Sequence, residues 1–307
     1  MKIIIHIKYA LFLALILRGP LAHTQTTVQV VTKSVDKTLP YKAGFSLNID
    51  AEKADITLKA NPNVKEINVK MELISKNPNL QNAKQDLDAL KYIVETQGKT
   101  VYLRNYIGIE KGSAKPTSDL KTRYTIEVPS EMVVSVKNNF GKLNVSGLRN
   151  KVMLITEFCK MTLTDIKGEM SINTRLGDID GRGLEGKISV QSNRSDVFLS
   201  MAKGECAITA QYGKINIETD KTFTQLSIKA DKAEVHFLPP AATAITYDLE
   251  AEYGKVILPQ KITPKYIEKS DKKEKVNFSY YDVGSDKKRT TLGVFIQTSF
   301  SSIEIKN

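Results

Sequence analysis

The stretch ISVQSNRSDVFLSMAKGE (residues 188–205) is one unit of a repeat that runs from Val134 to about Leu258. Five unit starts are separated by 18 residues, and two looser units follow after steps of 20 and 21. The successive starts are Val134, Val152, Met170, Ile188, Cys206, Leu226 and Tyr247. Self-similarity at a short fixed period indicates an array whose units bury their apolar faces only against neighbouring units.

The phase of the apolar residues within a unit indicates strands. Ile188 and Val190 open the unit, and Val197 and Leu199 follow nine residues after them. Alternation with a period of two is typical of a strand with one buried face. Stacked units would form parallel ladders with a strand spacing of about 4.8 Å. We therefore expect an all-β fold, a parallel β-solenoid (β-helix) with coils of about 18 residues.

The segments outside the regular repeat predict a cap and a last coil. Residues 47–58 match the coil pattern, and residues 80–90 carry apolar residues at helical spacing. Residues 92–104 predict a hairpin around Gly98. We expect an N-terminal β-rich cap with one short helix and the first coil over 25–131. The solenoid would then occupy 132–307, with a basic loop insertion at about 260–290 and a last coil closing the array at the C-terminus. The insertion would be either a long loop or an exposed hairpin.

The N-terminus has the pattern of an export signal. Lys2 and Lys8 precede an apolar run, residues 9–17, which is too short to span a bilayer. A signal peptide over residues 1–24 would leave no transmembrane span in the mature chain, and a retained anchor is the alternative. We expect an exported protein located in the periplasm or at the cell surface of a bacterium. Despite the formal net charge of +11, we do not expect nucleic acid as a partner, because the chain carries no nucleic-acid-binding motif.

Two cysteines, Cys159 and Cys206, are predicted to be unpaired. They fall in coils three steps apart, which corresponds to about 14 Å along the stack. A disulfide requires Cα atoms within about 7 Å.

The chain offers little catalytic or metal-binding chemistry. Outside the signal region the only histidine is His236, which lies between Val235 and Phe237 and should point outward to solvent. Asp178 and Asp196 occupy equivalent places in adjacent units, so they would lie near one another. They allow two alternatives, a carbohydrate-active enzyme of the parallel β-helix type and a calcium site. We expect no enzyme, no cofactor and no metal.

One column of side chains is the candidate ligand-binding site. Each unit has a small residue seven places after its start, and aromatic residues often precede that position. The candidate residues are Phe140, Phe158, Tyr212 and Tyr253, with Lys142, Lys160, Lys214 and Lys255 beside them. Leu176 and Phe300 occupy the same column. One interpretation is a stripe that binds a glycan or a partner protein. The other is a row of stacked corners that close the core.

The segments QYGKINIE (residues 211–218) and EYGKVILP (residues 252–259) share the repeat's spacing of glycine and apolar residues. With the export signal and the last coil, they resemble bacterial envelope proteins with β-strand-repeat domains of unknown function, close to the adhesin head GIN domain family. The resemblance covers about residues 40–307. It implies the fold and offers no catalytic residues.

The expected function is that of an exported, non-enzymatic cell-envelope protein, an adhesin-like or scaffold β-solenoid. Its partner would be an envelope protein or a glycan. The resemblance also permits a role as an accessory of envelope-stress signalling. The alternative from the residues alone is the carbohydrate-active enzyme that uses Asp178 and Asp196.

Overall fold

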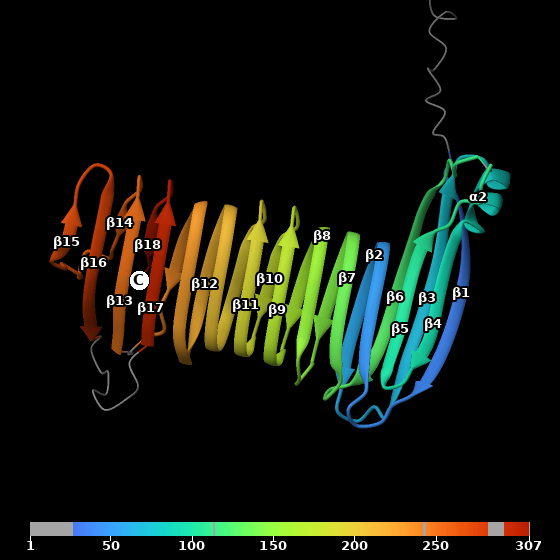
Figure 1. The fold of residues 1–307 in the computed structure, drawn as a ribbon, viewed down its shortest axis with the longest axis horizontal. Coiled ribbons are helices and arrows are strands. Elements are labelled where there is room, and N and C mark those ends of the chain that lie inside the picture. Colours follow the sequence, from blue (N-terminus) through green and yellow to red (C-terminus); the bar gives the residue numbers. More distant parts are fainter. Residues whose placement is uncertain (1–26, 113, 242–243, 282–291, 307) are drawn as a thin grey trace, which may run out of the picture.

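The computed structural model describes residues 27–112, 114–241, 244–281 and 292–306. The predicted signal peptide, residues 1–24, lies outside the described residues. The molecule is an elongated stack of strands that run across its long axis, with one short helix at one end (Figure 1). The all-β class with a single short helix is therefore confirmed for the described part of the chain.

The regular coils pair in parallel at the predicted period. They are built from β7 (Val133–Ser146), β8 (Val152–Thr164), β9 (Lys167–Arg175), β10 (Ile179–Arg182), β11 (Glu185–Asn193) and β12 (Val197–Leu238). Met170 of β9 lies beside Val152 of β8, and Ile188 of β11 lies beside Met170. Each pair is separated by 18 residues, so the 18-residue spacing of the sequence is the register of the parallel ladder.

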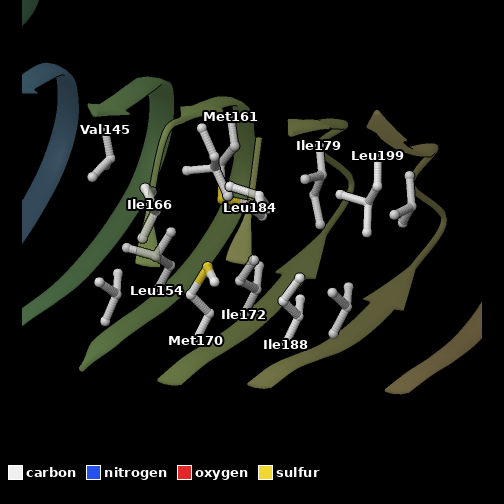
Figure 2. Packing of buried hydrophobic residues seen from close by; sticks show 14 of the residues in the cluster. Val145, Leu154, Met161, Ile166, Met170, Ile172, Ile179, Leu184, Ile188 and Leu199 are labelled. Carbon is white, nitrogen blue, oxygen red and sulfur yellow. The ribbon is translucent and has the colours of Figure 1, made fainter. Parts of the chain in front are cut away.

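The core is the space between the two strand layers of each coil. Ile172 and Ile188 approach it from one layer, and Ile179 and Leu199 approach it from the other (Figure 2). All four side chains are buried. Burying one such aliphatic side chain contributes about 1.5–3 kcal/mol to the free energy of folding. Apolar residues at alternate positions in every coil therefore stabilise the whole length of the stack.

The N-terminal end is closed by antiparallel strands and the helix. Its elements are β1 (Gln29–Pro40), β2 (Ser46–Asn61), β3 (Glu66–Asn77), α2 (Leu80–Leu87), β4 (Leu90–Gln97), β5 (Thr100–Ile107) and β6 (Asp119–Pro129). β2 lies in parallel between β7 on one side and β5 with β6 on the other. The outer edges of β5 and β6 pair antiparallel with β4 and β3, and β3 pairs with β1. The side chain of Asn79 caps α2.

The C-terminal end departs from the expected order of coils. Its elements are β13 (Ala244–Glu252), β14 (Val256–Ile257), β15 (Tyr266–Lys269), β16 (Lys273–Tyr281), β17 (Leu292–Ser299) and β18 (Ile303–Ile305). Val294 of β17 lies beside both Leu226 of β12 and Tyr247 of β13. The last coil is therefore inserted between two earlier coils, and the chain end lies within the stack (Figure 1). The expectation that this coil closes the array was wrong.

The predicted basic loop at about 260–290 is in part a hairpin. β15 pairs antiparallel with β16, and β16 covers the outer edge of β13. Glu250 of β13 accepts ion-paired hydrogen bonds from Lys273 and Lys275, with a nitrogen–oxygen distance of 2.8 Å in each pair. The sequence left a long loop and an exposed hairpin as alternatives for this segment, and β15 with β16 corresponds to the hairpin. Residues 282–291 lie outside the described part of the chain.

Both cysteines are buried and free, as predicted. Burial raises the pKa of the Cys159 thiol to about 11 and that of the Cys206 thiol to about 12. The two residues act as small core side chains, and neither thiol has the lowered pKa of a reactive cysteine.

Candidate ligand-binding column

The candidate aromatic residues lie at one corner of the coils, one above another. We call this row the corner column and define it by nine residues that have left-handed backbone, with φ between 49° and 68°. In stacking order they are Lys53, Phe140, Phe158, Leu176, Arg194, Tyr212, Lys232, Phe300 and Tyr253. Left-handed backbone costs about 1–2 kcal/mol for a residue that carries a Cβ atom. The stack therefore maintains this strained conformation in every one of these coils.

The small residue after each corner allows neighbouring coils to approach closely. A Cβ atom added at Gly141 would lie 2.0 Å from the carbonyl oxygen of Ala54, and one at Gly254 would lie 1.9 Å from that of Ser301. Cys159 and Ser195, which hold side chains at the same position of other coils, are accommodated with their side chains buried. The small slot of the repeat is therefore set by backbone packing between coils.

Polar side chains inside the stack hold the corner backbone. Thr174 Oγ1 donates a hydrogen bond to the carbonyl oxygen of Gly177 at 2.9 Å. Thr298 Oγ1 makes the same bond to Ser301 at 2.9 Å. Asn138 Nδ2 donates to the carbonyl oxygen of Ala54 in the adjacent coil at 2.9 Å. These bonds tie the inner polar side chains to backbone carbonyl groups at the corner of the same or the adjacent coil.

The side chains of the corner column stack on one another. The Phe140 and Phe158 rings are parallel to within 2°, with centroids 4.7 Å apart. The rings of Phe300 and Tyr253 stack in the same way at 5.0 Å. Aromatic pairs in offset stacks contribute about 0.5–1.5 kcal/mol beyond the area they bury.

Two cations of the column lie against aromatic rings, and Lys232 lies between two of them. The Arg194 guanidinium lies 5.5 Å from the centroid of the Tyr212 ring. Lys232 Nζ lies 5.5 Å from the Tyr212 centroid and 5.6 Å from the Phe300 centroid. Both cations are within the range of a cation–π interaction. Because neighbours cover the ring faces, the column presents ring edges and cationic groups to solvent.

Exposure separates the two interpretations of the column. Phe140, Phe158, Tyr212, Phe300 and Tyr253 keep between 36% and 57% of their surface accessible. Rings that closed the core would be buried. These side chains are stacked corners, as one interpretation had it, but they do not close the core, and the column is a ridge on the surface.

The four candidate lysines do not form one basic stripe. Each lysine follows a residue of the corner column by two positions, so the lysines share a second row beside the column. Lys142 and Lys160 are neighbours in this row. Lys214 Nζ is 3.5 Å from Glu234, and Lys255 lies beside Ser302. Acidic residues separate these lysines along the row, so positive and negative charges alternate in short blocks.

Asp178 and Asp196 lie in this row and are adjacent, as predicted. Asp178 Oδ1 accepts a hydrogen bond from the backbone nitrogen of Asp196 at 3.0 Å. Asp196 Oδ1 accepts one from the backbone nitrogen of Lys214 at 2.8 Å. Asp55 makes the same contact with Lys142 at 3.1 Å. These carboxylates link one coil to the next.

Comparison with known families identifies the chain. The sequence profile of the family Toastrack DUF4097 matches residues 38–289, which is most of the chain. The protein belongs to the Toastrack DUF4097 family. No match was found among curated proteins.

Three solved structures are similar to the Toastrack chain. A candidate adhesin of Bacteroides fragilis is 8% identical, with a TM-score of 0.44 and coverage of 89% of this chain and 97% of that one. A candidate adhesin of Parabacteroides merdae is 10% identical, with a TM-score of 0.44 and coverage of 90% and 97%. A candidate lipid-binding protein of Parabacteroides distasonis is 12% identical, with a TM-score of 0.35 and coverage of 90% and 97%.

His236 is less exposed than the sequence predicted. Its side chain lies on the outer face of β12 and is 16% exposed. Nδ1 contacts the carboxylate of Glu304, and Nε2 lies 3.5 Å from Glu234. The outward direction of His236 is therefore as predicted, but its two carboxylate neighbours cover most of the side chain. The partner Glu304 comes from the inserted last coil, whose position the repeat pattern did not indicate.

Within the residues that the structure describes, no cluster of three or more His, Cys, Asp or Glu could hold a metal ion. In the same residues, no helix has the length and apolar character needed to cross a membrane.

Sequence reasoning missed two features of the site. Lys53 belongs to the corner column, and its place six residues after Leu47 was a signal that could have identified it. The contact of Lys232 with Phe300 joins residues 68 positions apart. No pattern within one unit of the repeat could have predicted that contact.

Proposed function

We propose that this Toastrack chain is an exported, non-enzymatic interaction module of the bacterial cell envelope. Its stacked coils would form a rigid β-solenoid that displays the corner column to an envelope protein or a glycan. The protein would act in the periplasm or at the cell surface, after removal of the signal peptide predicted over residues 1–24. In this sense its role is adhesin-like.

The observation that carries the proposal is the exposed, strained corner column. Glycine would relieve the left-handed backbone at each of its positions, yet none of its nine positions is glycine and most hold large or cationic side chains. Aromatic and arginine side chains are the types enriched at the energetic centres of interfaces. The row combines both types along most of the molecule.

The carboxylate pair gives less support to an enzyme. Asp178 and Asp196 each use an oxygen on the backbone of the next coil. Carboxylates bound in this way support the stack, and they lack the differing environments that separate a general acid from a nucleophile or base.

A binding assay with paired variants tests the proposal. The purified mature chain, the variant Tyr212→Ala/Tyr253→Ala and the control Phe198→Ala would be applied to a glycan array and to solubilised envelope proteins. Phe198 is a suitable control because it is an exposed aromatic residue of β12 outside the column. We expect the double variant to lose at least ten-fold in affinity and the control to match the wild type.

Two results would contradict the proposal. Binding that is unchanged in the double variant would make the column a purely structural feature. Cleavage of a polysaccharide that stops in Asp178→Asn would establish the carbohydrate-active enzyme instead.

A further inference from the structure

A polar groove runs beside the corner column, on the outer face of β9, β11, β12 and β17. It has a volume of about 650 Å³, which is within the range of ligand sites. The groove crosses five coils, which corresponds to about 19 Å at the spacing of parallel strands. Small inward residues, among them Ser192 and Ala210, form its floor. The groove can therefore accept an extended ligand that lies along the stack.

The walls of the groove carry rows of side-chain amides. Asn173 Nδ2 donates to Gln191 Oε1 at 3.4 Å along one wall. Asn193 Nδ2 donates to Gln211 Oε1 at 2.9 Å along the other, and Gln211 Nε2 reaches Asp231 at 3.4 Å. Each amide has two donor hydrogens and an acceptor with two lone pairs. These bonds use only part of that capacity, so the rows hold donors and acceptors in orientations fixed by their neighbours.

The backbone of the groove excludes recognition of a peptide by strand addition. β9 pairs with β11, and β11 pairs with β12, so their ladder groups bond to adjacent coils. A peptide that adds to a sheet needs an unpaired edge. None of the described residues that line the groove is aromatic, whereas protein interfaces are enriched in aromatic residues.

The charges of the groove disfavour a polyanion. Arg175 at one end pairs with Glu157 at 3.2 Å. Lys229 and Asp231 contribute opposite charges to the same stretch of the lining. A polymer that carries the same charge on every sugar unit would meet both positive and negative side chains along the groove. A hydroxyl group, which donates and accepts like the amides, suits the lining better.

We propose that this groove binds a neutral, linear glycan along the long axis of the stack, through its side-chain amides and above all through the row that contains Asn193 and Gln211. The inference rests on the proposed function in taking the chain to be a binding module. It deepens that function by naming the class of ligand and a second surface beside the corner column.

Isothermal titration of the purified mature chain tests the groove. The probes are cellohexaose, laminarihexaose, mannohexaose and maltohexaose as neutral glycans, and hexagalacturonate as an anionic one. The variant Asn193→Leu/Gln211→Met removes the amides while keeping their volume. The control Asn144→Leu/Asn216→Leu changes exposed or half-buried amides of β7 and β12 outside the groove. The column variant Tyr212→Ala/Tyr253→Ala is measured in parallel.

We expect at least one neutral hexasaccharide to bind, equally at 50 and 300 mM NaCl. The groove variant should weaken its binding at least ten-fold, and the control should leave it unchanged. The proposal is overturned if no neutral hexasaccharide binds, if the groove variant binds like the wild type, or if hexagalacturonate binds better and is released by salt. Loss in the column variant alone would uphold the proposed function and overturn the groove. Loss in the groove variant alone would uphold the groove and the role as a binding module, and it would overturn the corner column as the contact surface.

Discussion

At the scale of single residues, the corner of each coil depends on two adjacent positions with different roles. The first has left-handed backbone and an outward side chain, as at Tyr212 and Tyr253. The second is small because the neighbouring coil approaches to contact distance, as at Gly141 and Gly254. Strain at the first position is therefore tolerated because packing at the second fixes the turn.

Substitution of Gly141 by alanine tests the packing at the corner. The new Cβ atom would lie 2.0 Å from the carbonyl oxygen of Ala54, which is backbone and cannot move without separating two coils. We expect Gly141→Ala to lower the free energy of unfolding by at least about 2 kcal/mol, measured by urea denaturation. Gly98→Ala is the control, because it also has positive φ but no atom within 4 Å of the added Cβ. Equal losses in the two variants would mean that backbone strain, and not contact between coils, sets the small slot.

The direction of the corner side chains could not be predicted from the alternation of the sequence. Inward residues occur at even offsets before the corner, as in Ile188 and Val190, and at odd offsets after it, as in Val197 and Leu199. The corner residue lies where the even and odd patterns of inward residues meet. Alternation counted from the first strand places its side chain inside, and alternation counted from the second places it outside. Only the sign of φ at that residue, which the sequence does not display, turns the ring to solvent.

At the scale of elements, the added strands at the two ends cover the edges of the coils. At the C-terminal end β16 pairs with β13, and Glu250 of β13 forms ion pairs with two lysines of β16. Hydrogen bonds from Lys273 and then Lys275 hold the pKa of the Glu250 carboxyl below its usual value. An exposed strand edge invites pairing with other chains, so this cover also protects the end of the stack.

The pH dependence of stability should report the Glu250 cluster. A folded-state pKa below the unfolded value means that the carboxylate stabilises the fold above the unfolded pKa, which is about 4.3 for glutamate. This contribution is lost as the pH falls through the folded pKa. Thermal unfolding between pH 3 and 7 should therefore show a steeper acid loss for the wild type than for Glu250→Gln. Superimposable curves would mean that the two lysines do not stabilise the charged form.

The order of the coils was predictable only in part from the sequence. The 18-residue spacing from Val134 to Cys206 predicted the parallel register correctly, because consecutive units are neighbours there. The steps of 20 and 21 at Leu226 and Tyr247 hid the insertion of another coil between those units. A repeat pattern shows which residues can share a column, but it does not show which remote segment does so.

A buried charge in the inserted coil tests this order. Ile296 lies between Ile228 and Leu249 and is 1% exposed. Ile296→Asp should lower the free energy of unfolding by about 3–5 kcal/mol, since it buries an uncompensated charge. Phe295→Asp, at an adjacent exposed position, should change it by no more than about 0.5 kcal/mol.

Hydrogen exchange would locate the damage from Ile296→Asp. In a stack where each coil contacts only its neighbours, damage remains local. Residues 226–257 should lose protection while residues 134–193 keep theirs. Uniform loss along the chain would contradict a coil-by-coil stack, and unchanged protection at 226–257 would contradict the inserted position of β17.

At the scale of the whole molecule, the inserted coil makes the corner column continuous. Phe300 fills the place between Lys232 and Tyr253, so the row passes without a gap from Lys53 to Tyr253. The groove lies along the same side, because its wall residues Asn193 and Gln211 directly precede Arg194 and Tyr212. A ligand of the column and a ligand of the groove would thus meet on one side of an extended molecule.

The corner column is proposed to contact a ligand in the cell envelope. Site-specific photocrosslinking in intact cells would detect that contact, with p-benzoylphenylalanine placed in turn at Phe140, Tyr212, Tyr253 and the control Phe198. All four side chains are exposed, so differences in yield would report proximity to a ligand. We predict a discrete crosslinked product from the three column positions and none from Phe198. Equal yields at all four positions, or products from Phe198 alone, would contradict the account.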